Sequence, residues 1–244
     1  MQILVIGATG ATGRFVVREL LSRGHNVTAI VRSSARLAEL VGDSPQLTVV
    51  QGSVLDLTEA ELATHLEDCD AVVSCLGHTL DFKGLFGQPR RLVTDSVRRL
   101  CTVIKAREPG PPARFALMNT TGVRNHDLEE TVSVPQRIVL GLLRHLVPPH
   151  ADNEDAADFL RTEVGQSDPR VEWVVIRPDT LINESEMSDY HVHPSPTRSA
   201  IFDSGKTSRI NVACFMTKLV TDDQTWTTWK GRMPVIYNQS SGNA

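Results

Sequence analysis

The chain has 244 residues, with 25 Lys and Arg against 29 Asp and Glu, so its formal net charge is -4. This slight acidity argues against nucleic acid as a partner, because domains that bind it usually carry a strongly basic face. A 41% hydrophobic composition excludes a disordered chain, and no apolar run approaches the ~18 residues of a membrane span. The four cysteines show no metal-ligand spacing and the N-terminus lacks the basic segment of a signal peptide. We therefore expect a cytoplasmic protein with reduced thiols.

The first half of the chain alternates short β-rich runs with helical patterns. The expected strands are Gln2–Ile6, Asn26–Val31, Leu47–Gln51, Ala71–Cys75 and Arg114–Met118. The expected helices are Thr12–Arg23, Ala35–Leu40, Thr58–Leu66 and Pro89–Arg107. Repeated alternation of this kind predicts a parallel sheet with right-handed crossovers, and hence an α/β fold with a doubly wound, Rossmann-type sheet.

The second half is less regular. Its expected helices are Pro135–Leu146, Asp152–Thr162 and Asn211–Val220, and its expected strands are Val171–Arg177 and Met233–Tyr237. Thr180–Ser208 has few periodic apolar positions and is expected to be one long connection, which in compact domains is usually functional. We predict a single domain over residues 1–238, with substrate-binding insertions at about 122–170 and 180–208 and a disordered tail at 239–244.

Three glycines follow the first expected strand, in the segment Gly7-Ala-Thr-Gly10-Ala-Thr-Gly13, and lead into the first helix. The missing side chains let the backbone approach a pyrophosphate, and the N-terminus of a helix favours its negative charge. Glycines are also common in ordinary turns, but the order strand, turn, helix is that of a dinucleotide fingerprint. The residues predicted to bind the cofactor here are Gly7, Thr9, Gly10, Ala11, Thr12 and Gly13.

The glycine spacing is GxxGxxG, and it occurs together with NTTGV after the fifth expected strand and RPDTL after the sixth. With these motifs the chain resembles the atypical short-chain dehydrogenase/reductase superfamily, in particular its NAD(P)H-binding, NmrA-like and biliverdin-reductase-B-like members. The resemblance covers roughly Met1 to Leu181. It implies the Rossmann fold and a nicotinamide dinucleotide, and it leaves the substrate open.

The resemblance also implies where the cofactor lies. Ser53 and Val54 should line the adenine pocket, and the segment Cys75, Leu76 and Gly77 should run along the ribose and the nicotinamide. The turn that contains Pro178 should pack against the nicotinamide carboxamide, and Thr120 should also contact the cofactor. Cys75 could also be a reactive thiol, but a small cysteine at the end of a strand more often only packs.

The end of the second expected strand indicates which nucleotide is bound. A carboxylate there would bind the ribose 2′-hydroxyl of NAD and repel a 2′-phosphate. This chain instead has Arg32 and Arg36, with no carboxylate before Glu39. Because a guanidinium is suited to bidentate contact with phosphate, we predict NADP(H), although arginines are also common at solvated helix starts.

The usual catalytic residues of the superfamily are present only in part. Thr120 and Thr121 match its Ser or Thr after the fifth strand, so one of the two hydroxyls is expected to hold a substrate carbonyl oxygen. The Tyr-x-x-x-Lys pair is absent, because the only tyrosines are Tyr190 and Tyr237 and neither is followed by lysine four residues later.

The segment His150-Ala-Asp152-Asn-Glu-Asp155 could replace the missing pair. His150 is the leading candidate for proton donor, because an imidazole titrates near neutrality, and Asp152 is a weaker one. The alternative is structural: His150 is then a loop residue, and Asp152 or Asn153 caps the following helix. Two further histidines, in His191-x-His193, lack a third ligand at suitable spacing, so we expect no metal site.

These features favour an NADPH-dependent oxidoreductase that reduces a small carbonyl, quinone or conjugated acceptor by hydride transfer. The missing Tyr/Lys pair also suits a regulatory protein of the NmrA-like kind, which senses NADP(H) and acts through a partner protein. A redox-neutral isomerase or cyclase is the third alternative. We expect a small-molecule substrate, no nucleic-acid or membrane partner, and either a monomer or a homodimer.

Overall fold

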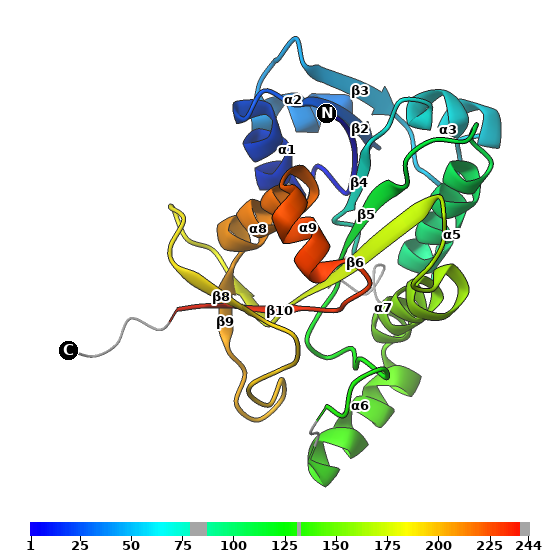
Figure 1. Ribbon diagram of the computed structural model, residues 1–244. Coiled ribbons are helices and arrows are strands. Elements are labelled where there is room, and N and C mark those ends of the chain that lie inside the picture. The colour runs from blue at the N-terminus through cyan, green and yellow to red at the C-terminus, as the bar shows by residue number, and fades with distance from the viewer. Residues whose placement is uncertain (79–86, 131–132, 240–244) are drawn as a thin grey trace.

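A twisted, mostly parallel sheet runs through the centre of the molecule (Figure 1). The computed structural model describes residues 1–78, 87–130 and 133–239. Within them, the strand order of the main sheet is β3-β2-β1-β4-β5-β6-β10-β8, and only β8 is antiparallel to its neighbour. The strands are β1 (Gln2–Ile6), β2 (Asn26–Val31), β3 (Leu47–Gln51), β4 (Ala71–Ser74), β5 (Ala113–Met118), β6 (Val171–Pro178), β8 (Tyr190–His193) and β10 (Val235–Asn238). The predicted doubly wound Rossmann-type fold is confirmed.

Helices cover both faces of this sheet. One face packs against α1 (Gly13–Ser22), α2 (Ser34–Val41), α8 (Arg209–Thr221) and α9 (Asp223–Trp229). The other packs against α3 (Glu59–Leu66), α5 (Leu92–Lys105), α7 (Pro148–Asp158) and a π-helical continuation, η1 (Phe159–Val164). The strands between these two layers are therefore apolar on both faces, as the continuous apolar run of β1 predicts.

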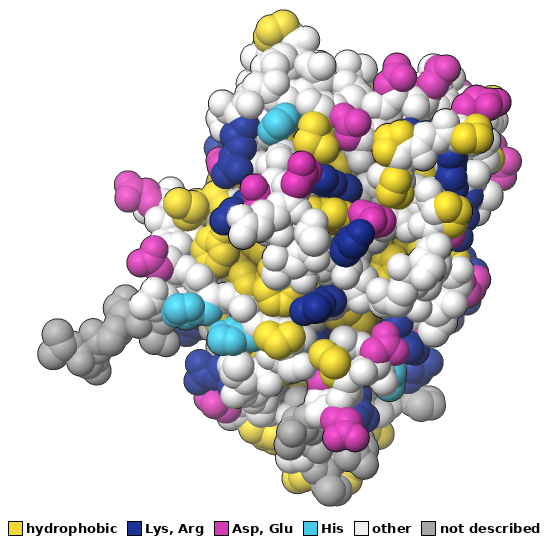
Figure 2. All heavy atoms as spheres, viewed as in Figure 1, with side chains coloured by type: hydrophobic (Ala, Val, Ile, Leu, Met, Phe, Trp, Pro, Cys, Tyr) yellow, Lys and Arg dark blue, Asp and Glu magenta, His cyan; other side chains and the backbone are white. Residues whose placement is uncertain are grey.

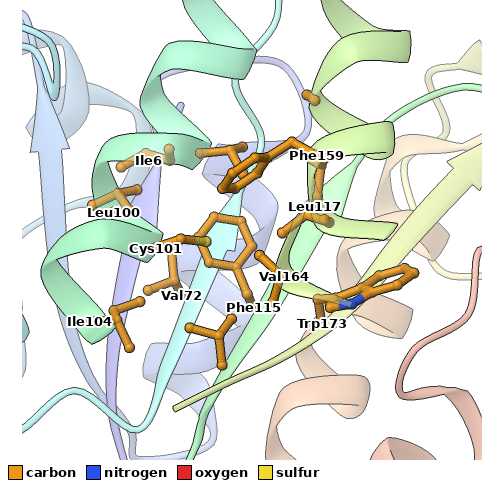
Figure 3. Close-up of a cluster of buried hydrophobic side chains, with 14 of the residues drawn as sticks. Ile6, Val72, Leu100, Cys101, Ile104, Phe115, Leu117, Phe159, Val164 and Trp173 are labelled. Atoms are coloured by element: carbon orange, nitrogen blue, oxygen red, sulfur yellow. The ribbon is translucent and has the colours of Figure 1, made fainter. Parts of the chain in front are cut away.

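Figure 3 shows the core on the α5 side, where Phe115 of β5 lies among side chains of α5 and η1. Phe115 is fully buried, and the neighbouring Trp173 of β6 is 1% exposed. The indole N–H of Trp173 donates to the carbonyl oxygen of Gly165 at 2.7 Å, which satisfies the one polar group of this large side chain.

The connection Thr180–Ser208 differs from the prediction, because it contains strands. β7 (Thr180–Ile182) and β9 (Lys206–Ser208) form a separate two-stranded parallel sheet, and β8 between them pairs with β10 of the main sheet. These strands have only three or four residues, too few to produce a periodic pattern that the sequence would reveal. The prediction of an unstructured connection was wrong.

Several helix boundaries also differ. α5 begins at Leu92 rather than Pro89, and α9 was not predicted. α7 begins at Pro148 rather than Asp152, because proline is well suited to the first turn of a helix. His150 therefore lies in the first turn of α7, and Asp152 lies within the helix rather than at its cap. The predicted tail falls mainly on residues 240–244, which are outside the described part of the chain.

Helix α6 (Val134–Leu146) extends away from the body at the lower end of the view in Figure 1. It exposes Ile138, Leu142 and Leu146, which are 60%, 56% and 65% exposed and share one side of the helix. Apolar side chains are visible at this lower end in Figure 2. Neither α6 nor any other helix in the described ranges is long and apolar enough to span a membrane.

Candidate functional site

A cleft of about 590 Å³ lies at the carboxyl ends of β1, β2, β3 and β4. Open parallel α/β sheets bind their ligands at this edge. Most of the predicted cofactor residues line it, namely Gly7, Thr9, Gly10, Arg32, Arg36, Ser53, Val54, Cys75, Leu76 and Gly77. Ala11, Thr12 and Gly13 are not among the lining residues; they follow Gly10 and lead into α1, which begins at Gly13.

The glycine loop is built by close contacts between backbone segments. Gly7 has φ +75, and a Cβ there would lie 2.4 Å from the carbonyl oxygen of Cys75 at the end of β4. A Cβ on Gly13 would lie 2.2 Å from the carbonyl oxygen of Gly7. The amide of Gly10 donates to that same oxygen at 2.9 Å and closes the turn. These glycines thus allow α1 and β4 to approach the loop, in addition to leaving room for a phosphate.

Two observations test whether a dinucleotide fits this cleft. The N-cap residue of α1, Thr12, makes no side-chain hydrogen bond to the first turn, so no capping side chain covers the positive end of this helix, which favours an anion. The hydroxyl of Ser96 in α5 also lines the cleft and is buried without a hydrogen-bond partner among the described residues. Because buried hydroxyls are normally paired, Ser96 is suited to contact with a bound ligand. The residues present fit the group.

Arg32 and Arg36 lie at the β2 side of the cleft. Both are exposed, and neither forms an ion pair within the described parts of the chain. Ser33 caps α2 by accepting the amide of Arg36 at 3.3 Å, which fixes the backbone that carries both guanidinium groups. The one acidic residue among the described lining residues is Asp56, after β3.

Thr120 and Thr121, predicted to hold the substrate, and Pro178, predicted with Thr120 to contact the cofactor, lie together at the ends of β5 and β6, outside the lining of the cleft. The amide of Thr121 donates to the carbonyl oxygen of Pro178 at 3.1 Å. The Thr121 hydroxyl bonds the carboxyl group of Asp179, which also accepts the amides of Thr180 and Gly205. Burial raises the pKa of Asp179 despite these hydrogen bonds. The Thr120 hydroxyl accepts the amide of Gly122 at 3.3 Å, but this side chain is only partly buried, whereas that of Thr121 is buried, so Thr120 is the better placed of the two threonines.

His150 packs against the backbone next to Thr120. A Cβ on Gly122 would lie 3.3 Å from Cε1 of His150 and 3.8 Å from Cγ2 of Thr120. Nε2 of His150 is 3.5 Å from the Glu154 carboxylate, one turn further along α7. Burial opposes ionisation of Glu154, but His150 and Arg144 hold its pKa below the usual value. The structure thus brings two of the three predicted catalytic residues together, although neither lines the cleft.

The sequence analysis did not single out a second imidazole, that of His78, which directly follows Gly77. Its Nε2 lies 2.8 Å from Oδ2 of Asp152, and the two side chains are only 6% and 1% exposed. The Asp152 carboxylate also accepts the amides of Val93 and Thr94 at 2.8 and 2.9 Å. Asp152 therefore caps α5, not its own helix as the structural alternative assumed. The position of His78 beside a predicted cofactor residue was the signal that could have identified it.

His191 and His193 lie on β8, at the opposite edge of the sheet from β3. Their ring centroids are 6.1 Å apart. In the ranges that the structure describes, no three His, Cys, Asp or Glu residues are grouped so that they could hold a metal ion. Cys75 is also unlike a reactive thiol, because burial raises its pKa to about 12.

The sequence profile of the NAD(P)H-binding family matches residues 7–223, which include the glycine loop, both arginines and the ends of β4, β5 and β6. The chain belongs to the NAD(P)H-binding family. This match confirms the predicted family and its use of a nicotinamide dinucleotide. The choice between NAD and NADP stays a prediction.

Individual relatives match this family member only in part. It is 37% identical to divinyl chlorophyllide a 8-vinyl-reductase, chloroplastic, of Arabidopsis thaliana over 84 residues. This aligned segment is 31% of this chain and 20% of that one. Over 77 residues it is 35% identical to the uncharacterized protein YwnB of Bacillus subtilis, which is 32% of each chain. The matched segment thus spans between a fifth and a third of the length of these relatives.

Solved structures are similar over nearly the whole chain. The oxidoreductase YlbE from Lactococcus lactis has a TM-score of 0.67 at 18% identity, covering 98% of this chain and 91% of that one. A short-chain dehydrogenase/reductase from Veillonella parvula in complex with NADP has a TM-score of 0.68 at 15% identity, covering 98% and 95%. ChuY, an anaerobillin reductase from Escherichia coli O157:H7, has a TM-score of 0.65 at 16% identity and full coverage of both chains. At such identities the likeness shows the fold alone.

Proposed function

We propose that this member of the NAD(P)H-binding family is an NADPH-dependent oxidoreductase that reduces a small carbonyl, quinone or conjugated acceptor. The observation that carries the proposal is the cleft at the carboxyl ends of β1 to β4. It combines a glycine loop, two arginines without ion pairs among the described residues, and an unpaired buried hydroxyl on Ser96. The names of several relatives, among them a vinyl-reductase and an anaerobillin reductase, agree with reductase chemistry.

The preference for NADPH rests on Arg32 and Arg36. A 2′-phosphate on the adenosine ribose would lie near the end of β2, where both guanidinium groups can donate charge-assisted hydrogen bonds. No carboxylate occupies the position at which NAD-binding proteins hold the ribose hydroxyls, since the residue directly after β2 is Arg32.

The roles of the remaining residues follow from their positions. Gly7, Thr9 and Gly10 would hold the pyrophosphate, and Cys75 to Gly77 would contact the ribose and the nicotinamide. When bound, NADPH supplies the hydride. Thr120 would orient the acceptor oxygen. His150, which like Thr120 lies beside Gly122, is the proton donor that the sequence favours. We expect the substrate to lie under the connection 180–208. We also expect the protein to be cytoplasmic, with its four cysteines reduced.

A second candidate function is an NADP(H) sensor that acts through a partner protein. It is favoured by the missing Tyr-x-x-x-Lys pair. The two tyrosines lie on β8 and β10, at the edge of the sheet opposite to β3, and therefore away from the cleft. Such a protein needs the cofactor site but no catalytic acid.

Consumption of NADPH separates these functions. The purified protein is mixed with NADPH and a panel of quinones, flavins, aldehydes and conjugated ketones, and the near-ultraviolet absorbance of NADPH is followed, with NADH as control. We expect loss of absorbance that depends on one class of acceptor and is faster with NADPH. Tight NADPH binding without consumption by any acceptor would contradict the reductase proposal and favour the sensor or a redox-neutral enzyme.

A further inference from the structure

We propose that the hydroxyl of Ser96, on α5, contacts the adenine base of the bound nucleotide and contributes to nucleotide affinity. This inference rests on the proposed function, in which the cleft binds NADPH. It assigns a ligand to a side chain that no motif of the sequence selects. Ser96 is thus a binding residue for the cofactor and not a catalytic one.

Ser96 differs from the other unpaired hydroxyls by its position at the cleft. Among the described residues, three buried serine and threonine hydroxyls have no hydrogen-bond partner, those of Ser74, Ser96 and Thr217. All three residues are 0% exposed, and a buried hydroxyl without a partner costs free energy. Of the three, only Ser96 lines the cofactor cleft. A ligand bound in the cleft can therefore supply the partner that the Ser96 hydroxyl lacks.

The contacts of α5 turn this face of the helix toward the loop that follows β3. Leu92 and Ser96 are one helical turn apart, so they share one face of α5, and both line the cleft. Arg99, three residues after Ser96, lies on the same side of the helix. Its guanidinium donates to the carbonyl oxygens of Leu55 and Leu57 in that loop. Ser96 therefore lies at the end of the cleft that the loop after β3 forms.

The charges along the cleft indicate which part of the nucleotide reaches this end. The glycine loop and the N-terminus of α1 suit the pyrophosphate. Arg32 and Arg36, after β2, suit the 2′-phosphate of the adenosine ribose. Next to them the lining continues with the loop after β3, where Val54 and Leu55 offer apolar side chains. Because the same ribose carries the adenine, this flat and largely apolar base is the part of the nucleotide that lies at this end.

A serine hydroxyl suits contact with the edge of adenine. It can both donate and accept hydrogen bonds, and adenine has an amino group beside ring nitrogens that accept. The other serine in this part of the lining, Ser53, already accepts the amide of Leu55 at 3.3 Å. The Ser96 side chain has a single χ angle, so rotation to another staggered position is enough to turn its hydroxyl toward the base.

The first test uses opposite effects of Ser96→Ala on stability and on binding. Without nucleotide, the variant loses no hydrogen bond and gains a better helix former, so we expect its melting temperature to rise by about 2–4 °C. NADPH binding should weaken by about 10-fold, because the ligand loses a partner. Thermal unfolding and fluorescence titration measure the two effects. A lower melting temperature, or an unchanged Kd for NADPH, would overturn the proposal.

The matched control is Thr217→Val on α8. It also removes a buried hydroxyl that has no partner among the described residues, but Thr217 does not line the cleft. We expect this variant to bind NADPH as the wild type does. If Thr217→Val weakens NADPH binding as much as Ser96→Ala, the loss comes from a general change in the fold, and the proposed contact of Ser96 is wrong.

The second test locates the contact on the nucleotide. Adenosine 2′,5′-bisphosphate carries the base and the 2′-phosphate but no nicotinamide, so Ser96→Ala should weaken its binding by the same factor as that of NADPH. In its complex with wild-type protein labelled with carbon-13 at serine, we expect nuclear Overhauser contacts between the Cβ protons of Ser96 and the ring protons of adenine, with Ser96→Ala used for assignment. Unchanged affinity for this probe, or contacts with ribose protons alone, would overturn the assignment.

The outcomes distinguish the two levels of inference. If the wild-type protein consumes NADPH with an acceptor and Ser96→Ala binds NADPH equally well, the role of Ser96 is wrong and the proposed function stands. If the wild-type protein binds NADPH but reduces none of the acceptors, the reductase proposal fails, and the binding measurements still decide the role of Ser96. If it binds neither NADPH nor adenosine 2′,5′-bisphosphate, both proposals fail.

Discussion

Arg177 and Glu130 form an ion pair of 2.6 Å in which neither side chain reaches solvent, with exposures of 0% and 3%. The guanidinium of Arg177 also donates to the carbonyl oxygens of Met233 and Val123 at 2.8 and 2.9 Å. Glu130 accepts the amide of Asn125 at 2.8 Å. The pair therefore fastens the segment after β5 to the end of β6, beside the predicted substrate residues.

Removal of one partner should destabilise the fold. We expect Glu130→Ala to lower the free energy of unfolding by about 3–5 kcal/mol, because it leaves the Arg177 charge buried and unpaired. Urea unfolding measures this difference. The control is Glu163→Ala, which removes the exposed pair with Arg98 and should cost at most about 1 kcal/mol. If both variants lose the same free energy of unfolding, the buried ion pair contributes no more to stability than the exposed one.

The glycines of the cleft should respond differently to alanine. Gly13→Ala would place a Cβ 2.2 Å from backbone, so we expect both lower stability and loss of NADPH binding. Among the described residues other than its two chain neighbours, no atom lies within 4 Å of a Cβ built on Gly77, so Gly77→Ala should unfold like the wild type but bind NADPH more weakly if the cofactor passes there. Thermal unfolding and fluorescence titration measure the two effects. Unchanged NADPH affinity in Gly77→Ala would move the cofactor away from the end of β4.

Arg32 and Arg36 should determine which nucleotide is preferred. We expect Arg32→Asp to weaken NADPH binding by about 10- to 100-fold, because a hydrogen bond to a charged group contributes about 1.5–3 kcal/mol. NADH binding should be unchanged or tighter, since it has no 2′-phosphate to repel. Arg23→Asp, at the opposite end of α1, is the matched control. If both nucleotides keep their affinities in Arg32→Asp, the preference does not depend on this residue.

The buried thiols should resist alkylation and weaken the fold at high pH. Burial raises the pKa values of Cys75 and Cys101 from 9.0 to about 12 and that of Cys69 to about 11. Between pH 9.0 and these values the folded chain keeps protons that the unfolded chain has lost, so stability falls as pH rises through this window. Iodoacetamide followed by mass spectrometry should find these thiols unmodified in the native protein, and Cys75→Ala should reduce the slope of stability against pH.

The parts of the fold and site that depend on local pattern were predictable. The apolar run of β1, the glycine loop and the capping box of α3, formed by Thr58 and Glu61, are each specified by neighbouring residues. The position of the cleft was predictable from the expected strands, because the carboxyl ends of parallel strands meet at one edge of the sheet. For that reason most of the residues that the sequence predicts to bind the cofactor lie along the cleft.

The parts that depend on distant contacts were not predictable. Asp152 caps α5 across a separation of 58 residues or more, so its acidic neighbours on α7 gave no sign of that role. The hydroxyl of Thr121 forms a hydrogen bond with the Asp179 carboxyl group, and only the pairing of β5 with β6 brings these two side chains within reach of each other. The short strands β7 and β9 depend on each other for their hydrogen bonds, and β8 depends on β10. With three or four residues each, they are too short to show a periodic pattern.

On the proposal that the substrate binds beneath the connection 180–208, the two strand pairings of this connection limit how the substrate can enter. β7 and β9 hold its two ends to each other, and β8 joins its middle to β10 of the main sheet. A swing of the whole segment about its two ends could keep the β7–β9 pairing but would break the pairing of β8 with β10. The remaining freedom lies in two shorter loops, 183–189 and 194–205, between the attached strands. Admission of substrate should therefore depend on local rearrangement of one loop, and a cross-link within either loop should slow entry without affecting the nucleotide.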